Sequence, residues 1–127
     1  MKLRINGNSL RLRVGRSEVE RLLGRERLEE SIQFAPQPDA KLIYALEQTP
    51  SVSVPTVRYA EREVTVFLPS SLAETWCTSD IVGISERIGL GTFGTLELLI
   101  EKDFACLDRS DEHNQDTFAN PHAGAVC

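Results

Sequence analysis

The chain lacks any long apolar run. No apolar stretch approaches the ~20 residues that a membrane-spanning helix needs,. The N-terminal sequence MKLRINGNSLRLR alternates charged with apolar residues, where a signal peptide would have an unbroken apolar block,. We therefore expect a cytoplasmic protein without a membrane partner.

Cysteine and histidine are scarce. The three cysteines, Cys77, Cys106 and Cys127, are an odd number at irregular spacing, which argues against a disulfide framework and favours reduced thiols,. Both histidines, His113 and His122, lie near the C-terminus, and the sequence has no G-x-S-x-G elbow. These absences disfavour a hydrolase of the Ser, His and acid type.

What is present suits one globular domain. The 127 residues are 41% apolar and 26% charged, the proportions of an ordinary folded protein with one sizeable core,. The net charge of -5 hides an asymmetry, since residues 1–27 carry eight Lys or Arg and residues 101–127 carry six acids. The overall sign disfavours general nucleic-acid binding but leaves room for a local basic surface that binds a small anion.

Alternating apolar and polar residues predict half-buried strands, because successive side chains of a strand point to opposite faces. The first two alternating stretches, residues 2–6 and 9–14, are joined by Gly7-Asn8, which suits a hairpin turn,. Further strands are expected over residues 28–34, 41–47, 53–60, 63–68, 81–88 and 96–100. The last stretch also fits a helical spacing and could form a helix instead.

A capping box, in which a serine and a glutamate three residues later satisfy the free N–H groups of a helix start, occurs twice. Ser17 with Glu20 predicts a helix that runs to about Gly24, and Ser71 with Glu74 predicts a second one. The serines differ by 71 − 17 = 54 and the glutamates by 74 − 20 = 54. The chain therefore contains a candidate internal repeat with an offset of 54 residues.

The apolar pattern follows the same offset. Leu22 falls on Trp76 and Leu28 falls on Val82, although few residues are identical between the halves. The alternative is that two unrelated units have similar lengths by chance.

We thus expect an α+β fold built from a duplicated strand-strand-helix-strand-strand unit. The two units would cover residues 1–48 and 55–102 of a single domain over residues 1–107, followed by a mobile, polar and acidic tail over residues 108–127. About eight mainly antiparallel strands would close into a wide or flattened barrel, with two short helices.

This arrangement over residues 1–103 resembles the CYTH-like triphosphate tunnel fold, an eight-stranded barrel made from a duplicated unit. The resemblance implies a phosphohydrolase that depends on Mg²⁺ or Mn²⁺. Members of that superfamily begin with a Glu-x-Glu-x-Lys run that helps hold the metal, where this chain has Lys2-Leu3-Arg4-Ile5-Asn6. Separately, the segments MKLRINGNSLRLR and EKDFACL are similar to a small, uncharacterised bacterial family, which implies no activity.

A group of cations is the best candidate for a ligand-binding surface. If the apolar residues of the first hairpin face the core, its cations share the opposite face, and the repeat adds one more. These residues are Lys2, Arg4, Arg11, Arg13 and Arg58. Several cations at short range attract a phosphate or another anion. Acids that could balance these cations or hold a metal are Glu29, Glu47, Glu97 and Glu101. The alternative is an exposed strand face with cross-strand ion pairs.

Two other motifs have weaker interpretations. Gly89-Leu90-Gly91-Thr92-Phe93-Gly94 matches G-x-G-x-x-G, but between two strands it favours a flexible hairpin turn over a nucleotide site,. Four residues of the tail could bind zinc, although their spacing matches no zinc motif. They are Cys106, His113, His122 and Cys127. We also hypothesise that the acids of the tail fold over the basic hairpin and occupy the site of an anionic ligand.

The function that the sequence favours is a binding module for a small phosphorylated or otherwise anionic molecule. It needs no cofactor. The alternatives are the CYTH-like hydrolase, with Mg²⁺ or Mn²⁺, and a non-catalytic interaction or structural protein, which could form a homodimer through an exposed strand edge.

Overall fold

The structure is a computed structural model that describes residues 1–104 and 116–118. Its first five elements are β1 (Lys2–Asn6), β2 (Ser9–Val14), α1 (Arg16–Leu23), β3 (Leu28–Gln33) and β4 (Lys41–Thr49). The next five are β5 (Thr56–Ala60), β6 (Glu63–Pro69), α2 (Ser70–Thr78), β7 (Gly83–Gly89) and β8 (Thr95–Lys102). A short 3₁₀ helix, Gly91–Phe93, lies between β7 and β8. The predicted α+β class is thus confirmed.

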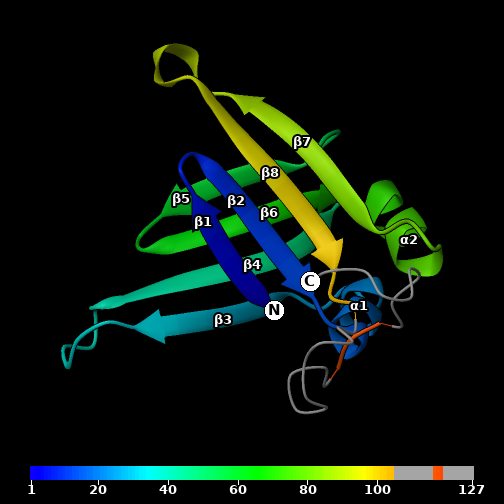
Figure 1. The fold of residues 1–127 in the computed structure, drawn as a ribbon, viewed down its shortest axis with the longest axis horizontal. Helices are drawn as coiled ribbons and strands as arrows, with labels where there is room; N and C mark the ends of the chain where they lie inside the picture. Colours follow the sequence, from blue (N-terminus) through cyan, green and yellow to red (C-terminus); the bar gives the residue numbers. More distant parts are fainter. Residues whose placement is uncertain (105–115, 119–127) are drawn as a thin grey trace.

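The strands form two separate four-stranded sheets, each assembled from both halves of the chain. One sheet has the order β1-β2-β8-β7 and the other the order β5-β6-β4-β3. The sheets lie one in front of the other with crossing strands, and α1 and α2 pack together at one end (Figure 1). Each first hairpin therefore pairs with the second hairpin of the other half.

The predicted closure of the strands into a barrel is wrong. The strands of the described residues form two sheets with free edges at β1, β7, β5 and β3, and no closed barrel. The predicted predominance of antiparallel pairing is confirmed, since four of the six strand pairs in the described part of the chain are antiparallel. The sheets are nevertheless mixed, because the central pairs β2–β8 and β4–β6 are parallel. Within each sheet the two central strands come from different halves of the chain and run in the same direction.

The order of elements in the first half recurs in the second, and most positions correspond at an offset of 54. For example, β1 begins at Lys2 and β5 at Thr56. The third strand is an exception. Leu28 pairs with Leu46, and Ile84 pairs with Ile100, so Leu28 corresponds to Ile84 at an offset of 84 − 28 = 56.

The predicted match of Leu28 with Val82 is therefore wrong by two residues. Val82 is 43% exposed, whereas both Leu28 and Ile84 are buried. The second half has two more residues before its third strand, and its last hairpin connection is two residues shorter. An alignment without gaps could not find this compensation.

The core lies between the sheets and beneath the helices. Leu12 and Ile100 from one sheet meet Leu46 from the other, and each helix contributes a fully buried residue, Leu22 from α1 and Trp76 from α2. The matched pair Leu22 and Trp76 was predicted from the repeat. Burial of such large side chains stabilises the fold by about 2 kcal/mol or more each.

The predicted capping boxes differ from the observed helix starts. Gly15 is the N-cap of α1, and its N–H donates to the Glu18 carboxylate at 2.9 Å. Ser17 lies inside the first turn and does not cap it. Pro69 precedes α2, which begins at Ser70 without a side-chain cap. The pattern placed the start of both helices two residues too late, because Gly15 and Pro69 carry no capping side chain.

The remaining local predictions are mostly confirmed. Gly7 has φ +56 in the β1–β2 turn. The stretch over residues 96–100 belongs to a strand, β8, and not to a helix. The glycine-rich segment connects β7 to β8 as a hairpin, in which the Leu90 N–H donates to the Gly94 carbonyl at 2.8 Å. The strand expected from residue 53 begins only at Thr56, after Pro55.

Among the described residues, neither α1 nor α2 has the length and apolar character needed to cross a bilayer.

The core position of Leu22 can be tested against its neighbour on the same helix. Leu22 is fully buried, whereas Leu23 is 39% exposed. We expect Leu22→Ala to lower the free energy of unfolding by about 2–5 kcal/mol, because it leaves a cavity in the core. Leu23→Ala should cost less than about 1 kcal/mol. Urea unfolding followed by Trp76 fluorescence measures both; equal losses would contradict the described core.

Candidate functional site

The predicted basic surface is largely neutralised. Arg11 and Arg13 lie on the outer face of their sheet, on the side of β2 opposite to the buried Leu12. Both guanidinium groups contact the same carboxylate, Glu101 on the adjacent β8. The Nε atoms of Arg11 and Arg13 lie 2.6 and 2.9 Å from Glu101 Oε1. These contacts match the alternative of cross-strand ion pairs.

Lys2 and Arg4 lie on β1 opposite Arg13 and Arg11, so these four cations share one face as predicted, whereas Arg58 does not join them. Lys2 Nζ lies 2.7 Å from Asp103 Oδ2, and Arg4 is exposed without an ion pair in the described part of the chain. Arg58 is on β5, in the other sheet, with its guanidinium carbon 5.1 Å from the centre of the Phe67 ring. Arg4 and Arg58 occupy corresponding positions of the repeat, but they lie in different sheets and therefore on different surfaces.

The candidate acids also have partners, through an arginine that the sequence did not single out. Arg27 donates to Glu29 at 3.1 Å and to Glu47 at 2.8 Å, and it contacts Glu63 as well. Although burial acts to lower it, the hydrogen bonds to these carboxylates raise the pKa of Arg27. Hydrogen bonds from Arg27, and then from Thr65, lower the pKa of Glu63.

This ion-pair cluster could not be read from the sequence, because Arg27 lies in the connection before β3. Its partners come from three different strands. The last candidate acid, Glu97, lies 3.6 Å from Arg87 at the surface. Within the described residues, no group of three or more His, Cys, Asp or Glu side chains is placed to hold a metal.

The candidate zinc ligands of the tail, Cys106, His113, His122 and Cys127, lie outside the described residues, so that hypothesis stays a prediction.

A cavity of about 410 Å³ lies at the helical end of the molecule, between the ends of β8 and α2 and the start of α1. Its volume falls in the range of small-molecule sites in proteins. The residues that line it are Arg16, Cys77, Ser79, Asp80, Lys102, Phe104 and Phe118. Cations, a carboxylate, a thiol and two aromatic rings therefore share one cavity.

Lys102 is the least expected of these residues. It is 5% exposed, and its Nζ donates to the Ser79 carbonyl oxygen at 2.6 Å. The same nitrogen lies 5.7 Å from the centre of the Trp76 ring and 5.6 Å from that of Phe118. Burial lowers the pKa of Lys102, while Cys77 and Asp80 oppose this effect. A buried group with a shifted pKa in a cavity is a typical sign of a functional site.

The other polar groups of the cavity set its charge. Arg16, at the start of α1, has no ion-pair partner in the described part of the chain, and neither has Lys102. Asp80 supplies one negative charge, so the formal charge of the lining is 2 − 1 = +1. Burial raises the pKa of the Cys77 thiol, only partly opposed by Lys102, which keeps the thiol protonated at neutral pH.

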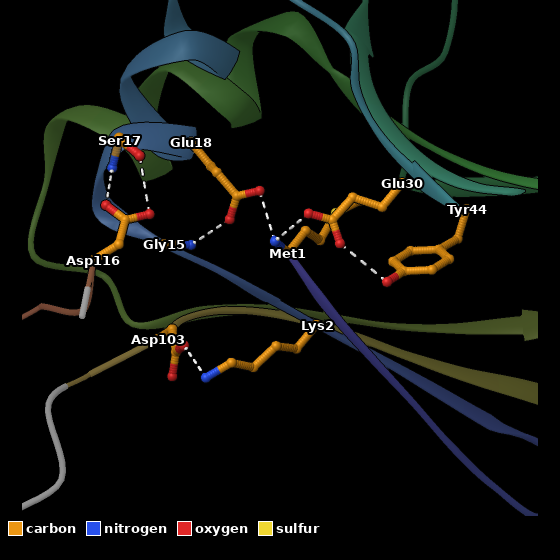
Figure 2. Close-up of polar contacts among 9 residues, drawn as sticks. All are labelled: Met1, Lys2, Gly15, Ser17, Glu18, Glu30, Tyr44, Asp103 and Asp116. Atoms are coloured by element: carbon orange, nitrogen blue, oxygen red, sulfur yellow. Dashed lines mark hydrogen bonds and ion pairs between the residues drawn. The ribbon is translucent and has the colours of Figure 1, made fainter. Parts of the chain in front are cut away.

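One side of the cavity is held by residues 116–118, which lie against the start of α1. The Asp116 carboxylate accepts hydrogen bonds from the Ser17 N–H at 3.0 Å and from its hydroxyl at 2.9 Å (Figure 2). A carboxylate at this end of a helix is favourable, because the first N–H groups are unpaired and carry positive partial charge. The Phe118 N–H donates to the Asp103 carbonyl at 2.7 Å.

These contacts bear on the hypothesis about the acidic tail. Asp116 caps α1 and does not contact the cations of the first hairpin. Lys2 of that hairpin pairs instead with Asp103, which directly follows β8 (Figure 2). The other acids of the tail lie outside the described residues.

The ammonium group of Met1 is a further buried charge. It lies 2.6 Å from a Glu18 carboxylate oxygen and 3.3 Å from one of Glu30, whose other oxygen accepts a hydrogen bond from Tyr44 (Figure 2). This network links α1 to β3 and β4, and all of its described polar groups are paired. We therefore assign it a structural role.

A second cavity, of about 340 Å³, lies at the opposite end of the sheet that contains β1, β2, β8 and β7. Its lining is polar, and its charged residues Arg87 and Glu97 face each other at 3.6 Å. It has neither an aromatic lining residue nor a buried charge. The cavity at the helical end is therefore the better candidate.

Comparison with known proteins identifies the family but no activity. The model of a family of unknown function, DUF7009, matches residues 1–122, and the chain belongs to this family. The expected similarity to an uncharacterised family is thus confirmed. No curated protein and no solved structure matches the chain, so the resemblance to the CYTH-like fold receives no support.

The Arg27 cluster predicts a specific response to acid. Since Glu63 has a lower pKa in the folded state, its contribution to stability is full above the ordinary value of 4.5 and is lost as the pH falls through the lowered value,. Arg27→Met should therefore lower the urea midpoint at pH 7 and reduce its further fall between pH 5 and pH 3. Arg21→Met, which removes an exposed pair with Glu26, is the control. Parallel curves for Arg27→Met and the wild type would contradict this role.

The position of residues 116–118 can be tested through Gly15. A Cβ atom at Gly15 would lie 2.3 Å from Asp116 Oδ2, a distance that real Cβ contacts do not show. Gly15→Ala should displace this segment and increase hydrogen exchange of the Phe118 N–H by about tenfold or more. In Gly24→Ala the new Cβ meets no atom closer than 3.4 Å, so the Phe118 N–H should exchange as in the wild type. Unchanged exchange in Gly15→Ala would show that the segment is placed differently.

Proposed function

We propose that this member of DUF7009 is a binding module for a small monocarboxylate with an aromatic or similarly apolar body, held in the cavity at the helical end. The observation that carries the proposal is that the cavity combines two cations, Arg16 and Lys102, that have no ion-pair partner among the described residues with the rings of Phe104 and Phe118. On the outer sheet face, by contrast, Lys2, Arg11 and Arg13 already have carboxylate partners.

The charge of the lining favours a monoanion over a polyphosphate. Two cations and Asp80 leave one net positive charge, which one carboxylate would balance. A triphosphate would bring several negative charges near Asp80 and would cost more in repulsion than two cations offset. The proposal thus keeps the anion-binding function expected from the sequence but moves it from the sheet surface to the cavity.

The apolar part of the ligand would contact the aromatic residues. The Phe104 and Phe118 rings meet edge to face, with centroids 5.7 Å apart. Their faces and edges can pack against a further ring, which adds to affinity beyond the area that is buried. Pockets of this kind, mostly apolar with a few well-placed polar groups, are the usual form of small-molecule sites.

The two other candidate functions have less support. The metal-dependent hydrolase stays a prediction, since the described residues bring no three potential metal ligands together. An interaction protein stays a prediction as well. Free strand edges and exposed apolar residues such as Phe93 and Tyr59 would suit it, but nothing in the fold selects a partner,.

Calorimetric titration with 4-(hydroxymethyl)benzoate tests the proposal. We expect saturable binding that Arg16→Met weakens by about tenfold or more, the effect of losing a hydrogen bond to a charged group, which is worth ~1.5–3 kcal/mol. The matched control is Arg4→Met, because Arg4 is also an arginine without an ion pair within residues 1–104 and 116–118 but lies on the outer sheet face. It should leave the affinity unchanged.

Three outcomes would contradict this site. One is the absence of binding at millimolar probe. Another is a loss of affinity in Arg4→Met but not in Arg16→Met, which would favour the sheet surface. The third is tighter binding of tripolyphosphate than of the carboxylate, with or without Mg²⁺.

A further inference from the structure

The amine of Lys102 differs from the other two lysine amines of the chain. Lys2 has a carboxylate partner in Asp103 at 2.7 Å, and Lys41 is exposed. Lys102 is buried, lines the cavity and has a carbonyl oxygen as its hydrogen-bond acceptor, with no ion pair in the described part of the chain. A buried ammonium without a carboxylate is costly, so this environment increases the fraction of neutral amine relative to an exposed lysine.

The internal repeat shows that the fold itself does not require an amine at this position. Gln48 corresponds to Lys102, since 102 − 48 = 54. Its side-chain amide donates to the Leu22 carbonyl oxygen at 2.7 Å, at the end of α1. Lys102 makes the matching contact with Ser79, at the end of α2. In the first half a neutral amide thus makes this hydrogen bond to a carbonyl oxygen at the end of a helix. The basic amine of Lys102 is not needed for such a contact.

We propose that Lys102 forms an imine with an aldehyde or ketone group of the ligand, so that the cavity takes a carbonyl-containing carboxylate. This inference rests on the proposed function, since Arg16 would hold the carboxylate. The Lys102 Nζ lone pair attacks the carbonyl carbon and forms a C–N bond. The carbonyl oxygen then leaves as water with the two protons of the amine, and a C=N bond remains. No atom is oxidised or reduced.

The surroundings of the amine suit this step. A neutral amine can keep one N–H on the Ser79 carbonyl while its lone pair faces the cavity,. The rings of Trp76 and Phe118, with centres within 6 Å of Nζ, keep the site apolar. Burial lowers the pKa of Lys102, against the opposing effects of Cys77 and Asp80, which increases the fraction of neutral amine at neutral pH. Arg16 is the other charged group that lines the cavity.

Cys77 is the other potential nucleophile of the cavity, and the structure favours the lysine. Burial raises the pKa of its thiol, and the thiolate is the reactive form,. The thiol therefore stays protonated and far less nucleophilic under the conditions in which the amine is partly neutral.

Reductive trapping on the whole chain tests the inference. The protein is incubated with 4-formylbenzoate and sodium cyanoborohydride, and labelling at Lys2, Lys41 and Lys102 is compared by peptide mass spectrometry. These three are the lysines of the chain. We expect Lys102 to be labelled at least tenfold faster than Lys41, with a rate that saturates with probe concentration. Its labelling should reach a plateau below pH 10.5, the ordinary pKa of a lysine amine.

Lys102→Gln is the matched variant, because it copies the residue that the first half has at this position. It should fold, lose the cavity adduct and leave the labelling of Lys2 and Lys41 unchanged. The wild-type comparison among the three lysines needs no variant, so it decides the question even if Lys102→Gln is unstable. Labelling of Lys102 that is no faster than that of Lys41 would overturn the inference.

The alcohol 4-(hydroxymethyl)benzoate separates the two proposals. It has nearly the same size and the same charge as 4-formylbenzoate, but it has no aldehyde group that could form an imine. If it binds and the aldehyde leaves Lys102 unlabelled, the imine is wrong and the binding site stands. If it neither binds nor slows the labelling of a reactive Lys102, the proposed function is wrong and the amine is reactive without a carboxylate site. If it competes with the aldehyde for Lys102, both proposals are supported.

Discussion

The structure depends on the parallel pairing of β2 with β8 and of β4 with β6. These two pairs join the halves of the chain, since each sheet contains one hairpin from either half. Parallel central strands end at the same edge of their sheet, so β2 and β8 both end beneath the helices. The ladder continues one step further, where the Asp103 N–H donates to the Val14 carbonyl at 2.9 Å. This pairing brings Lys102 next to the start of α1 and thereby forms the cavity.

The distribution of charge partners is what distinguishes the cavity from the surface. Arg11 and Arg13 share Glu101, and Arg27 contacts acids from three strands. Such pairs in mostly solvated positions add modestly to stability, and they leave little free charge to attract a ligand. Arg16 and Lys102 have no carboxylate partner in the part of the chain that the structure describes, and they line a cavity together with two aromatic rings. A sequence that is acidic overall can therefore still have a local site for an anion.

The two halves share a fold but not a site. Gln48 and Lys102 occupy corresponding positions and both bind a carbonyl oxygen at the end of a helix. In the second half that position lies beside Phe118, and the Asp116 side chain holds the same segment against α1 through Ser17. Lys102, the charged member of this pair, thus lies where residues 116–118 cover it. We infer that the pseudo-symmetric framework supplies the structure and that its asymmetric part supplies the function.

The sequence by itself determined the local structure and the order of elements. The alternation of apolar and polar residues depends only on neighbours along the chain, and it located the strands. The capping pattern located the two helices, and the offset of 54 residues matched Leu22 with Trp76,. Only the tertiary structure decided which strands pair, because parallel pairing between halves has no local signal. The two-residue shift at Leu28, the role of Arg27 and the cavity at Lys102 all follow from contacts between distant segments. The sequence alone indicated which basic residues are candidates for binding an anion. Whether a candidate already has a carboxylate partner depends on which acids the fold places beside it.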